Sequence, residues 1–302
     1  MIGVSIPLPS PCAEPVRAVH KEVKTVRPNN LKVRLREGKL LIGCLLAYNA
    51  PWLVEVLGTV GYDFVAIDLE HEPIDNESVA NMIRAADGVD LPSLVRMPCT
   101  ERLLPFLDAG VHGVIVPDLR DRAHAEEVVE MTRFHPMGCR TYYTQTRSAN
   151  YGVGIDERRW TQEINERQLV LGMIESISAV EQLDGILSVN GIDGYHVGPL
   201  DLAQSMGYPP KAELERLIED VVRRCRAAGK YVAVGVVTPW GMDNLPKWTR
   251  HGAQIFNVPS AWMLTHFASQ FLGEARSLVP AGQQDWPPIS PIAHNPYFTS
   301  DK

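Results

Sequence analysis

The feature that most constrains the fold is an eight-fold alternation of short apolar segments with longer amphipathic ones. The apolar runs have the length of strands and span 41–46, 62–68, 91–97, 113–117, 169–174, 194–197, 231–237 and 254–258. The amphipathic segments have the length and periodicity of helices and span 51–60, 77–86, 100–109, 123–133, 178–189, 212–228, 242–251 and 261–278. Strands that are apolar throughout are typical of a parallel sheet covered on both faces.

Such alternation is compatible with an open, doubly wound sheet or with a closed barrel. Eight strand–helix pairs favour the barrel, which typically needs about 250 residues. No GxGxxG motif follows an early strand, so the usual signal of an open dinucleotide-binding sheet is absent. We therefore predict the α/β class, with a single (β/α)8 TIM barrel.

The 302 residues exceed this requirement, and the excess falls into three segments. Residues 1–36 and 281–302 are rich in proline or charge and have no sustained period. We predict an N-terminal extension over 1–36, the barrel over 37–280 and a C-terminal tail over 281–302. Residues 134–168 interrupt the alternation and contain several aromatic and arginine residues, which favours an ordered lid or a subunit contact.

Bulk composition excludes several classes of partner. The net charge of −7 argues against nucleic acid. No segment approaches the roughly 20 apolar residues that cross a bilayer, so we expect no membrane contact. The five cysteines are dispersed without a CxxC pair, which indicates reduced thiols and not a disulfide framework or a zinc site. Residues 1–11 lack the pattern of a secretory signal, so we expect a cytoplasmic protein, with an organellar presequence as the open alternative.

In a barrel of this type, the active site forms at the C-terminal ends of the strands. Glu175 and Asp201 follow neighbouring strands at this end. Two carboxylates that share a buried site need a cation or a proton between them, and oxygen donors alone select a hard divalent ion such as Mg²⁺ or Mn²⁺. The alternative is that both carboxylates cap the helices that they precede.

Arg96, His71 and Asp68 are the next candidates at these strand ends. The cationic fork of Arg96 could stabilise an enolate oxygen, or it could simply pair with Glu175 or Asp68. His71 could act as a general base if Asp68 fixes one of its ring nitrogens, or it could be structural. The segment Gly198-Pro199-Leu200-Asp201 begins a helix, and the N–H groups of Leu200 and Asp201 could bind a substrate carboxylate.

These residues lie in segments that resemble the HpcH/HpaI aldolase family. The stretch GYDFVAIDLEHEP at 61–73 is similar to that family's segment around an Asp and an EH pair, and six further landmarks follow in order at 94–98, 107–110, 113–117, 136–140, 173–175 and 198–207. The resemblance covers about residues 38–275. It implies a barrel of the phosphoenolpyruvate/pyruvate-binding type and a metal-dependent (class II) pyruvate aldolase, commonly a hexamer with exchanged C-terminal helices.

The resemblance also implies roles for individual residues. Glu175 and Asp201 match the metal ligands, Arg96 matches the residue that stabilises the enolate oxygen, and Asp68 with His71 matches the acid–base pair. Two departures concern the second substrate. Thr141 follows Arg140 where the family usually has Gly, and Asp118 replaces the apolar residue of bacterial aldolases or the histidine of relatives of the macrophomate synthase type. The candidates for second-substrate recognition are Asp118, Arg120, Tyr142 and Arg147.

The resulting expectation is a carbon–carbon lyase that cleaves or forms 4-hydroxy-2-oxo acids through a pyruvate enolate. Mg²⁺ is the expected metal, with Mn²⁺ or Co²⁺ as alternatives, and the expected partners are a small 2-oxo acid, an aldehyde or other acceptor, and further copies of the chain. One alternative is an oxaloacetate decarboxylase or macrophomate synthase-like enzyme. Another is a non-catalytic, oligomeric ligand-binding barrel.

Overall fold

The fold is a closed barrel of eight parallel strands that are hydrogen-bonded in chain order. The computed structural model describes residues 31–235, 238–280, 286–289 and 297. The strands are β1 (Leu41–Leu46), β2 (Phe64–Asp68), β3 (Ser93–Arg96), β4 (Gly113–Val116), β5 (Leu169–Ile174), β6 (Gly194–Val197), β7 (Tyr231–Val234) and β8 (Ile255–Pro259). The predicted (β/α)8 architecture is confirmed.

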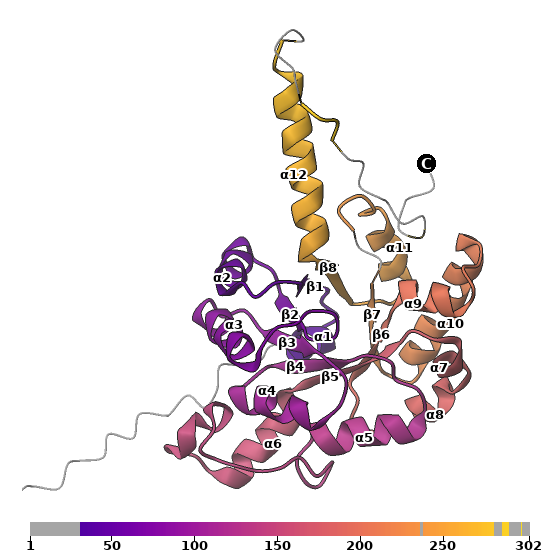
Figure 1. Cartoon of the computed structure of the whole chain (residues 1–302). Coiled ribbons are helices and arrows are strands. Elements are labelled where there is room, and N and C mark those ends of the chain that lie inside the picture. Colours follow the sequence, from indigo (N-terminus) through magenta and orange to yellow (C-terminus); the bar gives the residue numbers. More distant parts are fainter. Residues whose placement is uncertain (1–30, 236–237, 281–285, 290–296, 298–302) are drawn as a thin grey trace, which may run out of the picture.

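Helices follow the strands and form an outer ring around most of the barrel (Figure 1). They are α2 (Pro51–Val60), α3 (Asn76–Gly88), the 3-10 helix η1 (Glu101–Leu103) with α4 (Leu104–Ala109), α5 (Arg122–Thr132), α7 (Ile177–Glu181) with α8 (Leu183–Leu187), α9 (Pro199–Ser205) with α10 (Lys211–Ala227), and α11 (Asn244–His251). None of the described helices is long and apolar enough to span a bilayer.

Side chains alternate along each strand between the barrel interior and the layer beneath the helices. On β2, Val65 and Ile67 pack in the outer apolar cluster, whereas Phe64 and Ala66 belong to the cluster inside the barrel. Gly43 is the register partner of Phe64, and a Cβ at this glycine would lie 2.3 Å from the Phe64 ring. The absence of a side chain at position 43 therefore lets the aromatic ring fill the barrel interior.

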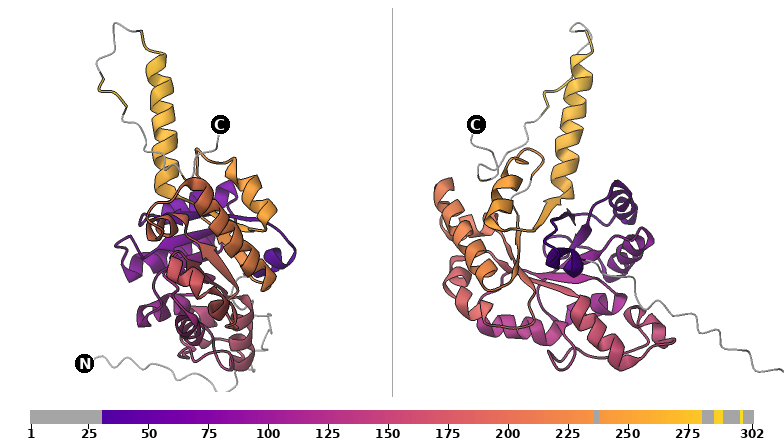
Figure 2. Two further views of the ribbon diagram at one scale, coloured as in Figure 1. Left: turned by 90° about the vertical axis from the view of Figure 1, so that its right-hand side faces the viewer. Right: turned by 180° about the vertical axis from the view of Figure 1, so that it is seen from behind.

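Helix α1 (Leu31–Arg36) closes the end of the barrel at which the strands begin (Figure 2). Leu31 and Leu35 are fully buried in the interior cluster, and the Leu35 carbonyl accepts a hydrogen bond of 3.2 Å from the side chain of Gln254. Lys32 forms an ion pair of 2.5 Å with Asp193. The sequence analysis assigned residues 31–36 to the N-terminal extension, whereas in the structure they pack into the barrel. A helix of six residues is too short to give a periodic signal. Residues 1–30 lie outside the described part.

The insertion at 134–168 is ordered, as predicted, and contains η2 (Arg147–Gly152) and α6 (Glu157–Arg167). Phe134, Ala149 and Trp160 form a small core of their own, and the Trp160 indole donates a hydrogen bond of 2.9 Å to the Ser148 carbonyl. This segment joins the end of α5 to the start of β5. It therefore lies at the closed end of the barrel, and the expectation of a lid is wrong.

Helix α12 (Ser260–Ser277) stands out from the barrel and does not pack on it as an eighth covering helix (Figures 1 and 2). Four of its large apolar side chains are exposed: Leu264, Phe267, Phe271 and Leu272. The amphipathic pattern predicted this helix but not its direction. Only parts of the predicted tail are described: Arg276 donates to the Pro287 carbonyl at 2.7 Å, and Tyr297 donates to the Pro209 carbonyl at 2.7 Å.

Candidate active site

A cavity of about 310 Å³ opens at the C-terminal ends of the strands, at the end opposite α1. Asp68, Arg96 and Asp201 contribute charged groups to its lining. Leu45, Met173 and Trp262 contribute apolar walls, and the Trp262 ring packs 5.5 Å from that of Trp240. Charged groups within an apolar wall are typical of a site that orients a small polar ligand.

Arg96 forms a two-point contact with Asp68. These residues are register partners on β3 and β2, and both point into the barrel. Arg96 Nε lies 3.0 Å from Asp68 Oδ1, and Nη2 lies 2.6 Å from Oδ2. Burial lowers the pKa of Arg96, but the hydrogen bonds and charge of Asp68 outweigh it and raise the pKa overall. The guanidinium is therefore a fixed positive charge at the cavity wall.

The expected contact between Asp68 and His71 is replaced by a different one. His71 Nε2 lies 3.7 Å from Glu70 Oε2, and the same carboxylate oxygen lies 3.5 Å from Arg96 Nε. Burial raises the pKa of Glu70, although the neighbouring positive charge of Arg96 opposes this shift. The His71 side chain is 62% exposed at the mouth of the cavity. Both Asp68 oxygens are occupied by Arg96, so Glu70 is the acidic neighbour of the histidine.

Glu175 follows β5 and lies directly behind Gly198, which is part of the cavity lining. Its Oε1 accepts a hydrogen bond of 2.6 Å from the Asp118 backbone N–H. A Cβ at position 198 would lie 2.8 Å from Glu175 Oε2, so only glycine leaves this oxygen room. Burial raises the pKa of Glu175 to about 7, and the negative charges of Glu70 and Asp201 add to the shift.

The start of α9 forms the cavity wall next to Glu175. Gly198 precedes the helix, Pro199 is its first residue, and both line the cavity together with Leu200 and Asp201. Proline suits this position because the first helical N–H has no partner within the helix. The predicted substrate-binding segment therefore faces the cavity.

The four candidates for second-substrate recognition separate into two pairs. Asp118 and Arg120 follow β4 at the open end, where they form an exposed ion pair of 3.6 Å, and neither is among the described residues that line the cavity. Arg147 pairs with Asp87 and donates to the Ala109 carbonyl at 3.0 Å, at the closed end.

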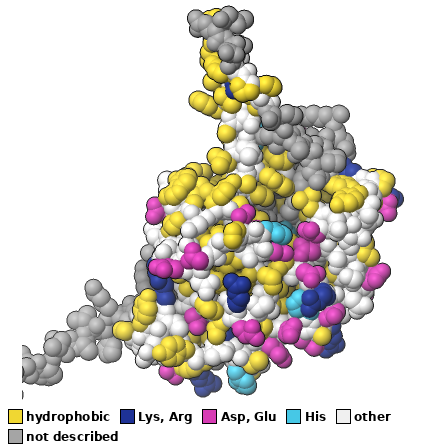
Figure 3. Space-filling view, in the orientation of Figure 1, with side chains coloured by type: hydrophobic (Ala, Val, Ile, Leu, Met, Phe, Trp, Pro, Cys, Tyr) yellow, Lys and Arg dark blue, Asp and Glu magenta, His cyan; other side chains and the backbone are white. Residues whose placement is uncertain are grey.

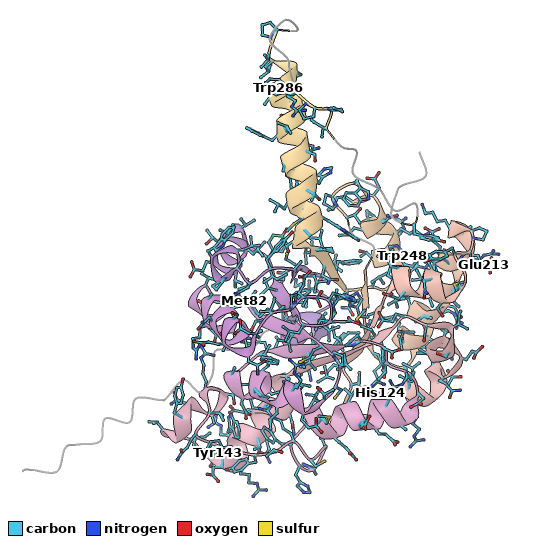
Figure 4. All side chains as sticks on the ribbon, in the orientation of Figure 1. Met82, His124, Tyr143, Glu213, Trp248 and Trp286 are labelled. Atoms are coloured by element: carbon cyan, nitrogen blue, oxygen red, sulfur yellow. The ribbon has the colours of Figure 1, made fainter. Side chains whose placement is uncertain are left out.

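Tyr142 lies on the same insertion as Arg147 and packs at 5.9 Å against the Trp160 ring. Figure 4 shows its neighbour Tyr143 at the edge of the molecule, far from α12. The structure therefore does not bring Tyr142 or Arg147 to the cavity of the same chain. Their position in the sequence, after a helix and not after a strand, already places them at the closed end.

Two polar residues of the cavity were missed by the sequence analysis. His196 on β6 and Asn257 on β8 line the cavity and are only 5% and 7% exposed. Burial lowers the pKa of His196 to about 3, and the charge of Arg96 adds to this shift. Alternation along the strands could have identified both, because His196 precedes Gly198 by two residues and Asn257 precedes Pro259 by two.

The donor set at Glu175 and Asp201 fits a hard divalent cation. Both groups offer carboxylate oxygens, and burial, together with the negative charges of Glu70 and Asp201, raises the pKa of Glu175, a shift that a bound cation would oppose. The described residues contain no group of three or more His, Cys, Asp or Glu side chains placed to enclose a metal ion. Two protein ligands would leave coordination positions for a substrate.

The fold and the position of this cavity are those of TIM-barrel enzymes, whose active sites lie at the C-terminal ends of the strands. The chain matches the HpcH/HpaI aldolase/citrate lyase family over residues 41–261. It belongs to this family.

Two curated relatives are aldolases. The chain is 32% identical over 211 residues to the hydroxypyruvate/pyruvate aldolase of Roseovarius nubinhibens, which covers 68% of this chain and 81% of the relative. It is 34% identical over 217 residues to the 2-keto-3-deoxy-L-rhamnonate aldolase of Escherichia coli K12, and the match covers 70% of this chain and 80% of the relative.

Two solved structures share the fold. Citrate synthase SbnG is 29% identical, with a TM-score of 0.72 and coverage of 82% of this chain and 97% of that one. Macrophomate synthase is 21% identical, with a TM-score of 0.71 and coverage of 82% and 88%, and supports the fold alone.

Proposed function

We propose that this protein is a divalent-metal-dependent aldolase that cleaves or forms 4-hydroxy-2-oxo acids through a pyruvate enolate. The observation that carries this proposal is the convergence of the Asp68–Arg96 pair, Asp201 and the adjacent Glu175 at one small cavity. The aldolase activities of the two relatives support the same reaction class.

Glu175 and Asp201 would hold the metal ion, which we propose to be Mg²⁺, with Mn²⁺ or Co²⁺ as alternatives. Dependence on a divalent metal is general in this family. When bound, the ion would act as a Lewis acid that polarises the keto group of the 2-oxo acid. The N–H groups of Leu200 and Asp201 at the start of α9 would receive the substrate carboxylate.

Arg96 would stabilise the negative oxygen that develops as the C3–C4 bond breaks. The electrons of that bond pass to C3 and form the enolate, while C4 leaves as an aldehyde. The two hydrogen bonds from Asp68 hold the guanidinium plane in one orientation, so the cation needs no rearrangement during the reaction. Asp68 thus has a positioning role in this proposal.

His71 would take the proton of the 4-hydroxyl group and later return a proton to C3. Its place at the cavity mouth gives it access to a substrate held deeper inside, and Glu70 at 3.7 Å is the acidic group beside its ring. Because Arg96 occupies both oxygens of Asp68, the proton relay would run through His71 and Glu70. Asp118 and Arg120 remain candidates for contact with the aldehyde.

The decisive experiment is a screen of pyruvate with a panel of aldehydes, run with Mg²⁺ and with EDTA. We expect product formation that requires the metal. A matched thermal-shift series with Mg²⁺ plus pyruvate or oxalate should raise the melting temperature, because ligands that bind the native state stabilise it. Stabilisation without turnover would contradict the aldolase and favour the non-catalytic binding barrel.

A second candidate function uses the same enolate but breaks another bond. Oxaloacetate decarboxylation releases CO₂ and needs no base at a hydroxyl group, and similarity to a citrate synthase favours chemistry that builds on an enolate. The exposed position of His71, apart from the buried Asp68–Arg96 pair, allows this route. Oxaloacetate should be assayed beside the same screen. Turnover of oxaloacetate that exceeds the rate of every aldol reaction would establish the decarboxylase.

We also propose that the protein is a homo-oligomer in the cytoplasm, and a hexamer is the expected size. The exposed apolar face of α12 and the neighbouring exposed residues Trp52, Val56 and Val60 of α2 support self-association. Figure 3 shows hydrophobic side chains along α12 and over the barrel beside its base. Free cysteines, including the buried Cys44 and Cys225, support a reducing compartment.

A further inference from the structure

One side of the cavity is apolar, and the mechanism above gives it no role. It consists of side chains from the ends of β1 and β8 and from the first turn of α12: Leu45, Ala47, Pro259, Ala261 and Trp262. Leu45 and Pro259 are register partners, so the two strand ends bring these residues together as one surface, which we call the apolar wall. The polar Asn257 lies two residues before Pro259 on β8 and therefore nearer the barrel interior.

The start of α12 holds Trp262 at the apolar wall. The Ser260 hydroxyl accepts a hydrogen bond of 3.1 Å from the Ala47 N–H, which joins the first residue of α12 to the end of β1. The Trp240 ring packs against the Trp262 indole with ring centroids 5.5 Å apart, and it also contacts the His266 ring one turn further along α12, at 6.0 Å. The aromatic surface is therefore in place before a ligand arrives, and binding there orders few side chains.

The apolar wall lies away from the groups proposed to hold the 2-oxo acid. In a closed barrel of eight strands in chain order, β1 lies across from β5, which ends just before Glu175. Asp201 and the start of α9 follow β6, the neighbour of β5. His71, the proposed base at the 4-hydroxyl group, follows β2, the neighbour of β1. A substrate that extends from the carboxylates past His71 therefore places the substituent on its C4 atom at the apolar wall.

The chemistry of the wall indicates the kind of substituent that it accepts. Burying an alkyl or aromatic group against such side chains stabilises a complex by about 25 cal/mol per Å² of apolar surface, and an indole also stacks on aromatic rings. A chain of hydroxyl groups would lose hydrogen bonds to water there. We propose that the apolar wall, with Trp262 as its specificity-determining residue, selects aldehydes with a branched alkyl or aromatic substituent over polyhydroxylated aldehydes. The proposal rests on the aldolase function and names its acceptor class.

The test compares two aldehydes with the same number of non-hydrogen atoms, 3-methylbutanal and glyceraldehyde, as acceptors for pyruvate in Mg²⁺. For the wild type, we expect a higher kcat/KM with 3-methylbutanal. Trp262→Thr should lower the 3-methylbutanal-to-glyceraldehyde ratio by about tenfold, the effect of lost apolar contact in a substrate pocket. Trp262→Phe retains an aromatic ring and should keep most of the ratio. Ala47→Ser places a hydroxyl group in the wall without altering α12 and should also lower the ratio.

Tyr143→Thr is the matched control. It removes an aromatic side chain that is 57% exposed at the edge of the molecule, far from α12 (Figure 4). Its ratio should stay within about twofold of wild type, because substitutions on the exposed surface have small effects.

Binding gives a readout independent of turnover. The acid 6-methyl-2-oxoheptanoate carries the tail of the 3-methylbutanal product but lacks the 4-hydroxyl group, so it cannot undergo aldol cleavage. Calorimetric titration in Mg²⁺ should give a lower Kd for this acid than for pyruvate in the wild type. Trp262→Thr should lose most of this difference, whereas Tyr143→Thr should retain it.

The outcomes separate this inference from the proposed function. An active wild type that prefers glyceraldehyde, or whose ratio is unchanged in both Trp262→Thr and Ala47→Ser, overturns the inference alone. Equal losses for both aldehydes in Trp262→Thr would show that the indole is only structural and would also overturn it. A wild type that turns over no aldehyde overturns the proposed function, while tighter binding of 6-methyl-2-oxoheptanoate than of pyruvate still supports the apolar wall. If Trp262→Thr does not fold, Ala47→Ser decides in both assays.

Discussion

Both carboxylate oxygens of Asp68 contact Arg96, at 3.0 Å from Nε and 2.6 Å from Nη2. The pair links neighbouring strands at the level where the barrel opens into the cavity. Its geometry depends on the planar fork of arginine, which a lysine cannot reproduce.

Arg96→Ala should therefore reduce the rate of aldol cleavage by at least about a hundredfold, comparable with the loss of one oxyanion donor. Arg96→Lys should recover little of this loss. Asp68→Asn should reduce the rate of aldol cleavage by less than Arg96→Ala does. The Arg96→Ala/Asp68→Asn double variant should be no slower than Arg96→Ala, because Asp68 acts through the arginine. Steady-state kinetics of the four proteins checks this expectation, and additive losses would show an independent role for Asp68.

His71→Ala should separate the two candidate reactions. Aldol cleavage needs a base at the 4-hydroxyl group, whereas decarboxylation of oxaloacetate does not. We expect the variant to lose aldol cleavage by about a hundredfold or more and to retain oxaloacetate decarboxylation. Parallel assays with both substrates give the answer, and Glu72→Gln, at the same cavity mouth, is the control. An equal loss of both activities would remove His71 from the role of base.

Glu175 should make stability depend on pH when EDTA removes metal ions. Burial raises its folded-state pKa from 4.5 to about 7, so between these values the folded protein holds a proton that the unfolded chain releases. The contribution of Glu175 to the free energy of unfolding is therefore fully present below pH 4.5 and is lost as the pH rises through 7. The loss amounts to at most roughly 3 kcal/mol. Urea unfolding should show this slope in the wild type, and Glu175→Gln should flatten it.

Mg²⁺ should counteract the loss of stability that Glu175 causes as the pH rises to neutral, because the metal and the proton compete for the same carboxylate. The gain in melting temperature on adding Mg²⁺ should grow as pH rises from 5 toward 8. A gain that does not depend on pH would argue against Glu175 as a ligand.

Helix α12 should control assembly. Leu264, Phe267 and Phe271 recur at helical spacing on one exposed face of α12, and the exposed Leu278 follows directly after the helix. An exposed apolar face of this kind is typical of a protein–protein contact. Phe267→Glu with Phe271→Glu should shift the protein to a smaller species in light scattering coupled to size-exclusion chromatography. Thr265→Glu adds a negative charge to an exposed position on the side of the same helix away from Phe267 and Phe271, and should leave the size unchanged. An unchanged size in the double variant would place the subunit contacts elsewhere.

Helix α1 should be required for stability. Leu35→Ala should lower the free energy of unfolding by about 2–5 kcal/mol, because the side chain is 2% exposed inside the barrel. Val33, on the same helix, is 49% exposed, so Val33→Ala should have an effect of at most about 0.5 kcal/mol. Urea denaturation of both variants tests whether residues 31–36 belong to the barrel core.

The sequence predicted the barrel because unbroken apolar strands alternating with amphipathic helices have few other solutions. It also placed Arg96, Glu175 and Asp201 at strand ends, where a barrel brings them together. It could not predict the partner of Asp68, since Arg96 and His71 are equally compatible with the spacing, and only the β2–β3 register favours the arginine. The direction of α12 was equally hidden, because an amphipathic pattern specifies an apolar face but not what covers it.

Residues 134–168 have a practical consequence. The turn around Gly152 and Gly154, where both glycines have positive φ, carries the exposed side chains of Tyr151 and Val153. It is built on a separate small core at the end of the barrel opposite the cavity. A fluorescent label or an immobilisation tag inserted there would remain remote from the reacting groups, and the enzyme could be fixed to a support with its substrate entrance facing the solution.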